Sequence, residues 1–314
     1  MDWVDIALTV ENTYAETVMA IFHESIPGGI VIEELSHETR ENDIERDRYQ
    51  RNGKITPCVN SRQERITIRG YLPNDGKFSV IIGELKSSLQ RVFGEKMDIE
   101  SCLDLKEVQE DDWAHSWKKF YKPFNIGRKL FIKPIWEEVI EPEDRVIVEV
   151  DPGMAFGTGT HPTTCMCLRA LEINIVGGEK ILDLGTGSGI LAVAAAKLGA
   201  DSVLAVDCDS IAVTIARENA YSNGVEGIVT VREGELATVI AEGFDIVIAN
   251  INKATLLPLI ELFPAYLQKA GLLILSGIMV EHQGLFMRQL TGKGLKIKTV
   301  EIDAGWVAFT AVFI

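Results

Sequence analysis

The sequence predicts an α/β protein with two domains, the larger of which is a doubly wound, mostly parallel sheet of seven strands with an antiparallel C-terminal hairpin. Three observations favour this class. Strand and helix patterns alternate from Lys180 onward, a glycine-rich turn joins the first of these strands to its helix, and residues 1–108 carry a strand and helix order of their own. A length of 314 residues also exceeds the roughly 150 residues that are typical of one domain.

Bulk composition limits the possible functions. A net charge of −15 argues against a protein that holds nucleic acid by its phosphates, which requires a basic face. The charge suits a basic protein partner, although many proteins are acidic only for solubility. No apolar run reaches the roughly 18 residues of a membrane span, no signal peptide precedes the first strand, and the cysteines show no disulfide spacing. We therefore expect a cytoplasmic protein that binds no membrane and no nucleic acid directly. A monomer is also expected, although composition alone does not indicate it.

Residues 1–108 follow the order β-α-β-β-α-β, which is typical of a small α+β domain with a ferredoxin-like fold. Apolar and polar residues alternate at the start of the chain, which predicts a strand, and apolar residues recur at helical spacing from Val80 to Val92. The expected strands are 3–10, 29–34, 65–71 and 99–108, and the expected helices are 13–23 and 77–93. Residues 35–63 are polar and without periodicity, so we expect an insertion without regular structure.

Residues 109–128 are interpreted as an aromatic linker helix between the domains. Four aromatic side chains share one helical face, namely Trp113, Trp117, Phe120 and Tyr121. Pro123 then ends the helix. The aromatic face either packs the two domains together or also borders the path of a substrate.

The larger domain spans residues 129–314. Two strands, 130–135 and 146–150, lead into it, and a helix begins at Pro162. From there strands alternate with crossover helices, which indicates parallel pairing. The expected elements are strands 181–184, 202–206, 227–232, 244–249 and 271–276, helices 190–198, 211–223 and 253–267, and a closing hairpin of strands 297–303 and 306–313. A sheet that ends on such a hairpin is more typical of methyltransferases than of dehydrogenases.

A glycine-rich turn and a carboxylate together predict a site for an adenosine. The turn over 183–189 reads DLGTGSG, in which Gly185 and Gly187 let the backbone bend sharply and let a ligand approach closely. Asp207 ends the next strand about 20 residues further on, where a carboxylate accepts hydrogen bonds from ribose hydroxyls. Ile190 stands where a dinucleotide site has its third glycine. Both NAD and S-adenosyl-L-methionine fit this pattern, and so does a tight turn without a ligand.

Two further segments bear on the ligand. Asn250 follows an apolar strand close to where the sheet order should reverse, and it is either a ligand contact or the N-cap of the next helix. The loop 151–164, DPGMAFGTGTHPTT, places hydroxyls at a helix N-terminus, which favours a carboxylate such as that of a methionine. His161 either makes a structural hydrogen bond or faces the substrate. Cys165 and Cys167 have no partners at ligand spacing, so no metal site is expected.

These segments closely resemble the bacterial PrmA family, the ribosomal protein L-eleven methyltransferases, along essentially the whole chain. The resemblance implies a class I, Rossmann-like methyltransferase that uses S-adenosyl-L-methionine to methylate lysine side chains and the N-terminal amine of a basic large-subunit ribosomal protein. The cofactor-binding positions that we assign are Thr164, Gly185, Gly187, Asp207 and Asn250. The family's usual Cys and Leu are replaced here by Thr186 and Asn252.

The expected chemistry places few demands on side chains. Methyl transfer from a sulfonium requires an amine lone pair in line with the methyl group, and a lysine, with a pKa of about 10.4, must first lose a proton. We predict that Asn250, or the backbone carbonyl beside it, orients this amine as the catalytic residue, and that residues 1–108 recognise the protein substrate. No strong general base stands out. The alternatives are a methyltransferase of another protein or small amine, an NAD-dependent dehydrogenase, and a non-catalytic ribosomal adaptor.

Overall fold

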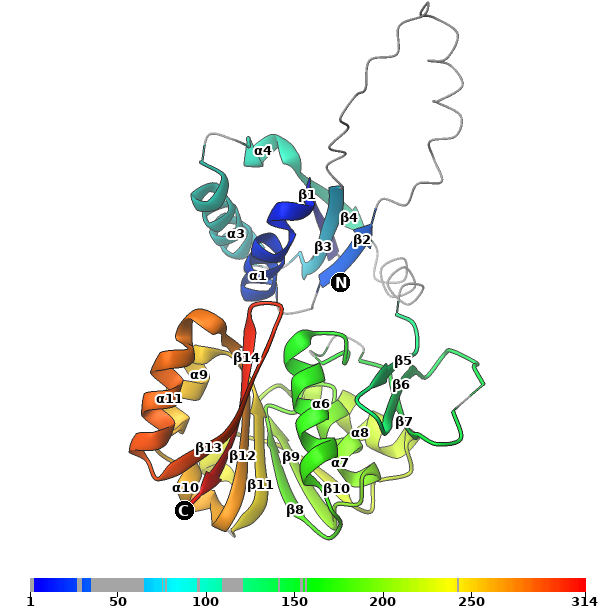
Figure 1. Ribbon diagram of the computed structural model, residues 1–314. Coiled ribbons are helices and arrows are strands. Elements are labelled where there is room, and N and C mark those ends of the chain that lie inside the picture. Colours follow the sequence, from blue (N-terminus) through cyan, green and yellow to red (C-terminus); the bar gives the residue numbers. More distant parts are fainter. Residues whose placement is uncertain are drawn as a thin grey trace, which may run out of the picture. The chain divides into compact units, whose positions relative to one another are not determined.

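The computed structural model describes residues 3–26, 30–34, 65–74, 76, 78–94, 97–108, 121–140, 142–152, 155, 157–241 and 243–314. The chain forms two compact units, Met1–Phe120 and Tyr121–Ile314 (Figure 1). The predicted insertion at 35–63 and residues 109–120 of the predicted linker helix lie outside the described residues.

The N-terminal unit has the small α+β architecture that its element order predicts. Four strands form one antiparallel sheet in the order β2-β3-β1-β4. The strands are β1 (Trp3–Glu11), β2 (Ile30–Glu34), β3 (Arg65–Pro73) and β4 (Leu103–Val108). Helix α1 (Ala15–Ser25) follows β1, and α3 (Phe78–Phe93) follows β3. This order is that of a ferredoxin-like domain.

Alternating apolar side chains build the core of this unit. Val4, Ile6 and Leu8 of β1 are buried in one cluster, as the period-two pattern predicts. Phe22 of α1 and Leu89 of α3 belong to the same cluster, so both helices pack on one face of the sheet.

The structure differs from two predictions near the end of this unit and the start of the next. The predicted strand over 99–108 is wrong in its first four residues, which form the short helix α4 (Ile99–Cys102). The reason is local, because the N–H of Cys102 bonds to the carbonyl of Asp98 and closes a helical turn. Residues 121–128 are not helical as predicted, since they contain the strand β5 (Phe124–Ile126).

The C-terminal unit contains the predicted seven-stranded sheet, in the order β10-β9-β8-β11-β12-β14-β13. Strands β8 to β12 pair in parallel, and β14 pairs antiparallel with both β12 and β13. The strands are β8 (Lys180–Leu184), β9 (Ser202–Asp207), β10 (Val229–Glu233), β11 (Phe244–Asn250), β12 (Leu267–Met279), β13 (Leu295–Asp303) and β14 (Trp306–Phe313). The doubly wound class and the closing hairpin are thus confirmed.

Helices cover both faces of this sheet (Figure 1). One face carries α6 (Pro162–Asn174), α7 (Ile190–Lys197) and α8 (Ser210–Ser222), and the other carries α9 (Lys253–Leu259), α10 (Phe263–Tyr266) and α11 (Gln283–Gly292). In β11, Ile246 and Ile248 belong to the first core, whereas Val247 and Ala249 belong to the second. The strand is buried on both faces, which explains its continuous apolar sequence.

Two helices of the second face differ from the prediction. The single helix predicted over 253–267 is divided into α9 and α10, and Pro264 lies in the first turn of α10, where its missing N–H is tolerated. Helix α11 was not predicted, although Phe286 and Leu290 stand one turn apart and are fully buried.

A three-stranded sheet leads into the loop that precedes α6. Its strands are β5, β6 (Leu130–Pro134) and β7 (Val146–Val150), and β6 and β7 pair in parallel, which confirms the two paired strands expected here. The chain leaves β7 at Asp151 and reaches the start of α6 at Pro162.

The strand order places three segments at one edge of the large sheet. The chain moves from β8 outward to β9 and β10, whereas β11 lies on the opposite side of β8, so the strand order reverses between β8 and β11. Because parallel strands end at the same edge, the glycine-rich turn after β8, Asp207 at the end of β9 and Asn250 at the end of β11 share that edge. Doubly wound sheets bind their ligands at this position.

Candidate functional site

The glycine-rich turn after β8 is held in one conformation by the neighbouring strand. The N–H groups of Gly185 and Thr186 both donate to the carbonyl of Val206, at 2.8 Å and 3.1 Å. Gly185 has a φ of 73°, and a Cβ there would collide with Ile251, the residue after Asn250. A glycine is therefore required at this position, and its close contact with Ile251 brings the turn next to the end of β11.

The last glycine of the turn allows close packing of a helix. Gly189 has a φ of 80°, and a Cβ there would lie 3.0 Å from Ala216 of α8. In a dinucleotide site the third glycine provides this helix packing one residue later. In this G-x-G-x-G turn, Gly189 allows the same close approach of a helix.

Thr186 has a structural role within the turn. Its hydroxyl donates to Oδ2 of Asp183 at 2.6 Å, and both side chains are buried. Burial raises the pKa of Asp183 to about 7, and the bond from Thr186 opposes this rise. The hydroxyl of Thr186 therefore satisfies one oxygen of a buried carboxyl group.

Asp207 is fixed above the turn by two main-chain bonds. Its Oδ2 accepts from the N–H of Gly187 at 2.8 Å, and its Oδ1 accepts from the N–H of Asp209 at 3.0 Å. The carboxylate is half-buried, and each oxygen retains acceptor capacity beyond these bonds. Both oxygens can therefore accept further hydrogen bonds, which is the property expected of a carboxylate that binds ribose hydroxyls.

Asn250 contacts the start of α6 and leaves one atom without a partner. Its Nδ2 donates to Oγ1 of Thr164 at 3.3 Å, and its side chain is 9% exposed. Its Oδ1 is buried and has no hydrogen-bond partner among the described residues. A buried acceptor without a partner costs free energy, so this oxygen is an expected point of contact for a ligand.

The alternative role of Asn250 as a helix cap is taken by another residue. Asn252 is the N-cap of α9, and its Oδ1 accepts from the N–H of Thr255 at 3.0 Å. Asn250 makes no such bond. Asn252 therefore supplies the cap of α9, and Asn250 does not have that role.

The loop before α6 is tied to the glycine-rich turn. Gly157 and Gly159 have φ values of 107° and 86°, which favour glycine. The carbonyl of Gly157 accepts a hydrogen bond from Oγ of Ser188 at 2.6 Å. The hydroxyl of Tyr121 donates to the carbonyl of Thr158, and burial raises the pKa of this phenol above its usual value, so the hydroxyl stays protonated.

His161 makes a structural hydrogen bond, which is one of the two roles considered for it from the sequence. It is the N-cap of α6, where its Nδ1 accepts from the N–H of Thr163 at 3.3 Å. Its ring stands edge-on to Trp306 of β14, with 5.1 Å between the ring centroids. Burial lowers the pKa of His161 to about 4, so the ring is neutral at pH 7.

The predicted site residues therefore lie at one edge of the sheet. Gly185, Gly187 and Asp207 form one connected group, and Thr164 and Asn250 form another. The contact between Gly185 and Ile251 joins the two groups. One participant, Asn219 of α8, was not predicted from the sequence. Its side chain bonds to Asp151 and to Ser188 of the glycine-rich turn.

Neither a metal centre nor a membrane helix stands out in the part of the chain that the structure describes. Within those residues, no group of three or more His, Cys, Asp or Glu side chains is placed to hold a metal ion, and no helix is both long and apolar enough to span a membrane.

Comparisons with known proteins agree with this geometry. The family model described as Ribosomal protein L11 methyltransferase (PrmA) matches residues 2–313. The chain is 38% identical over 313 residues to the Ribosomal protein L11 methyltransferase of an Exiguobacterium strain, and 39% identical over 314 residues to that of Desulforamulus reducens, with 99% of each chain covered in both cases. A crystal structure of a ribosomal protein L11 methylase from Lactobacillus delbrueckii subsp. bulgaricus is 35% identical with a TM-score of 0.58, covering 61% of this chain and 98% of that one. The chain belongs to the ribosomal protein L11 methyltransferase (PrmA) family.

Proposed function

We propose that this chain transfers methyl groups from S-adenosyl-L-methionine to amines of ribosomal protein L11, including lysine side chains and the N-terminal amine. The observation that carries the proposal is the buried Oδ1 of Asn250, which has no partner among the described residues. The next residue, Ile251, contacts Gly185 of the glycine-rich turn. An acceptor at this position would help to hold the reacting amine in line with the methyl group, as methyl transfer requires.

The residues of the site fit the cofactor. Asp207 would accept hydrogen bonds from the ribose hydroxyls, and Gly185 and Gly187 would let the adenosine approach the turn. Thr164 in the first turn of α6 would hold the methionine carboxylate, since a helix N-terminus favours an anion. When bound, the cofactor supplies an electrophilic methyl group whose leaving group is a neutral thioether.

Asn250 would act on the amine. Its amide oxygen accepts a hydrogen bond from a neutral amine, which leaves the lone pair directed away from the side chain. The ammonium form must first lose its proton, and a buried environment favours the neutral form. Asn250 thus serves as the catalytic residue by orientation, and the proton passes to solvent.

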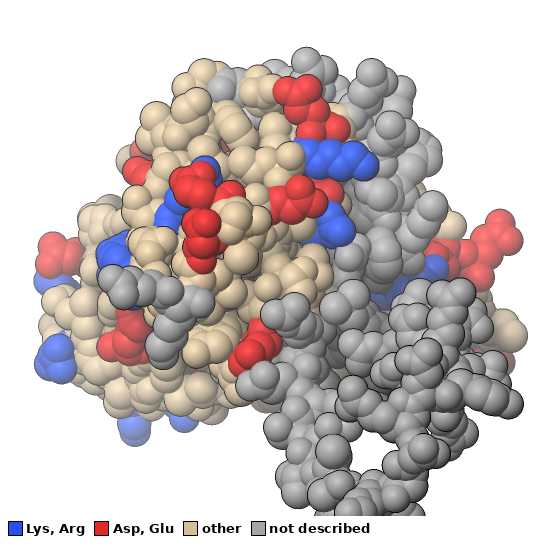
Figure 2. All heavy atoms as spheres, turned by 90° about the horizontal axis from the view of Figure 1, so that it is seen from above, with Lys and Arg blue, Asp and Glu red and all other residues tan. Residues whose placement is uncertain are grey.

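The partner is proposed to be a basic ribosomal protein, recognised by residues 1–108. The net charge of −15 suits such a partner. On the face drawn in Figure 2, the described acidic side chains are spread over the surface, and the described basic ones do not form a continuous stripe. We propose further that the enzyme is cytoplasmic and monomeric and makes no direct contact with nucleic acid, which proteins bind through a basic face.

A labelling experiment tests the proposal. The purified chain is incubated with methyl-labelled S-adenosyl-L-methionine and a mixture of all ribosomal proteins, which are then separated and identified. We expect the label in L11. Label in a different protein would identify another protein methyltransferase, and label in none, with cofactor still bound, would favour a small-amine substrate or an adaptor.

A further inference from the structure

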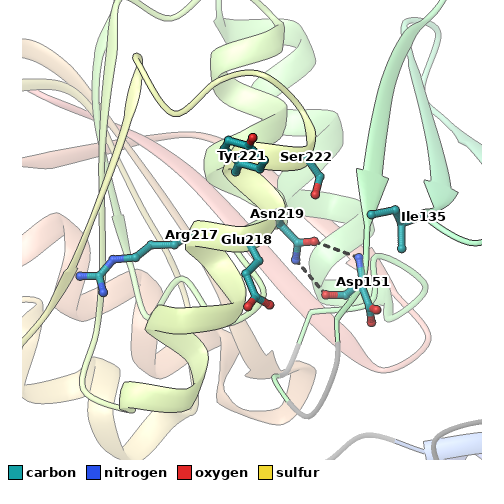
Figure 3. Close-up of a pocket in the computed structure, with 7 residues that line it drawn as sticks. All are labelled: Ile135, Asp151, Arg217, Glu218, Asn219, Tyr221 and Ser222. Atoms are coloured by element: carbon teal, nitrogen blue, oxygen red, sulfur yellow. Dashed lines mark hydrogen bonds between the residues drawn. The ribbon is translucent and has the colours of Figure 1, made fainter.

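Two asparagine side chains one helical turn apart bond to the outer edge of β7 and its continuation. Asn219 belongs to α8, and Asn223 is the C-cap of the same helix. Asn223 accepts a hydrogen bond from the N–H of Glu149 at 2.9 Å and donates one to the carbonyl of the same residue at 2.7 Å. Asn219 does the same with Asp151, at 2.9 Å in both directions (Figure 3). Each side chain therefore satisfies both main-chain groups of one residue, as a neighbouring strand would.

The repeat distances of a helix and a strand explain this match. Residues two apart in a strand present their main-chain groups to the same edge, at a repeat of about 6.6 Å. Side chains four apart on a helix lie about 5–6 Å from each other on one face. A pair of asparagines at positions i and i+4 can therefore pair with residues j and j+2 of a strand.

Of the two asparagines, Asn219 alone also bonds to the glycine-rich turn. Its Nδ2 donates a second hydrogen bond, at 2.8 Å, to the carbonyl of Ser188. The side chain is 3% exposed, whereas Asn223 is half-buried and bonds instead to the carbonyl of Asn219 within its own helix. One amide group thus connects the end of β7, the turn after β8 and α8.

We propose that Asn219 is a positioning residue for the cofactor, because its amide group fixes the first residue of the loop 151–161 against the glycine-rich turn. This inference rests on the proposed function, since both segments are those assigned to S-adenosyl-L-methionine. The bond from Ser188 to Gly157 joins the same two segments further along the loop. Asn219 would therefore hold Gly187 in position for the adenosine, without itself contacting the cofactor.

The surface hollow next to Asn219 should limit the loss of folding stability when its amide group is removed. It lines an open hollow of roughly 460 Å³ at the surface (Figure 3). The other residues that line the hollow are Ile135, Asp151, Arg217, Glu218, Tyr221 and Ser222. If the amide is removed, water from this hollow can hydrate the main-chain groups left behind, which limits the loss of stability. Water molecules that bind Asp151 and Ser188 separately would not fix the distance between the loop and the glycine-rich turn, whereas the single amide group of Asn219 does.

Asn219→Ala and Asn223→Ala form a matched pair, because each removes an amide that bonds to one residue of the β7 edge. We expect Asn219→Ala to raise the Kd and the KM for S-adenosyl-L-methionine about tenfold, with little change in kcat at saturating cofactor. Asn223→Ala should stay within about twofold of the parent. Asn219→Asp keeps an acceptor for the N–H of Asp151 but places a carboxylate against the carbonyls of Asp151 and Ser188. It should therefore weaken cofactor binding at least as much as Asn219→Ala.

Hydrogen exchange of the cofactor-free proteins gives a measurement that does not depend on binding. Asn219→Ala should raise exchange in the turn 185–189 and the loop 157–161, and Asn223→Ala should not. The proposal is overturned if both variants weaken binding equally, in proportion to their melting temperatures, or if exchange in the turn is unchanged in Asn219→Ala. If the parent binds no S-adenosyl-L-methionine, the proposed function fails, and the exchange data still decide whether Asn219 positions the two segments.

Discussion

Replacing Asn250 by alanine separates a catalytic role of this side chain from a structural one. In the folded protein the side chain makes a 3.3 Å bond to Thr164, and its buried oxygen has no partner among the described residues. Loss of one long hydrogen bond costs about 0.5–1.5 kcal/mol of folding free energy. For a domain of this size, the melting temperature should fall by about 1–6 °C.

The expected loss of rate is much larger than this loss of stability. If Oδ1 orients the amine, its removal lets the nucleophile shift out of line with the methyl group, and displacements of this kind cost about a hundredfold in rate. A hundredfold corresponds to about 2.7 kcal/mol in the activation barrier. The rate is measured in single-turnover experiments at saturating cofactor, so that weaker cofactor binding through Thr164 does not contribute.

Asn252→Ala is the matched control, two residues away on the same loop. It removes the N-cap of α9 and its bond from Thr255, which costs about 0.5–2 kcal/mol of stability. Its melting temperature should therefore fall at least as far as that of Asn250→Ala, while its rate stays near that of the parent. If Asn250→Ala methylates at nearly the parent rate, or if both variants lose rate in proportion to stability, the catalytic assignment is wrong.

Three other perturbations follow from the same geometry. Asp207→Ala should weaken binding of S-adenosyl-L-methionine about tenfold or more in titration calorimetry, because it removes the charge-assisted bonds that we propose to the ribose. Unchanged affinity would contradict this role. Residues 121–314 alone should bind the cofactor like the full chain but lose most activity on L11, so full activity would rule out recognition by the N-terminal unit. Burial lowers the pKa of His161 to about 4 from 6.5 in the unfolded chain, so its stabilising contribution is present above pH 6.5 and is lost as the pH falls towards 4. His161→Asn keeps a capping side chain that does not titrate, and its melting temperature should fall less than the parent's over that range; equal falls would show that His161 does not titrate as assigned.

The strands and the sheet class could be predicted because their signals are local. Alternation in β1 and continuous apolar runs such as Val247 to Ala249 in β11 identify strands without knowledge of the tertiary structure. The alternation of strands and helices then leaves few topologies open. The division of the helix predicted over 253–267 was missed because a proline is compatible with a first helical turn as well as with a break.

The site was predicted only where its residues lie in recognisable segments. Gly185 follows β8, and Asp207 and Asn250 are the last residues of β9 and β11, so the common edge of a parallel sheet brings them together. Asn219 was missed because its role depends on partners 68 and 31 positions away in the chain. The available signal was the pair of asparagines one turn apart, Asn219 in α8 and Asn223 at its C-cap, which becomes informative only once β7 is known to lie beside that helix. The cap formed by Asn252 was missed because Asn250 offered the same residue type nearby.

Mass spectrometry of purified L11, after incubation with the full chain and S-adenosyl-L-methionine, tests the central claim most directly. The account predicts mass increases in steps of one methyl group, located on lysine side chains and the N-terminal amine, and absent or strongly reduced with Asn250→Ala at saturating cofactor. Unmodified L11, under conditions in which the chain binds the cofactor and methylates a different molecule, would contradict it.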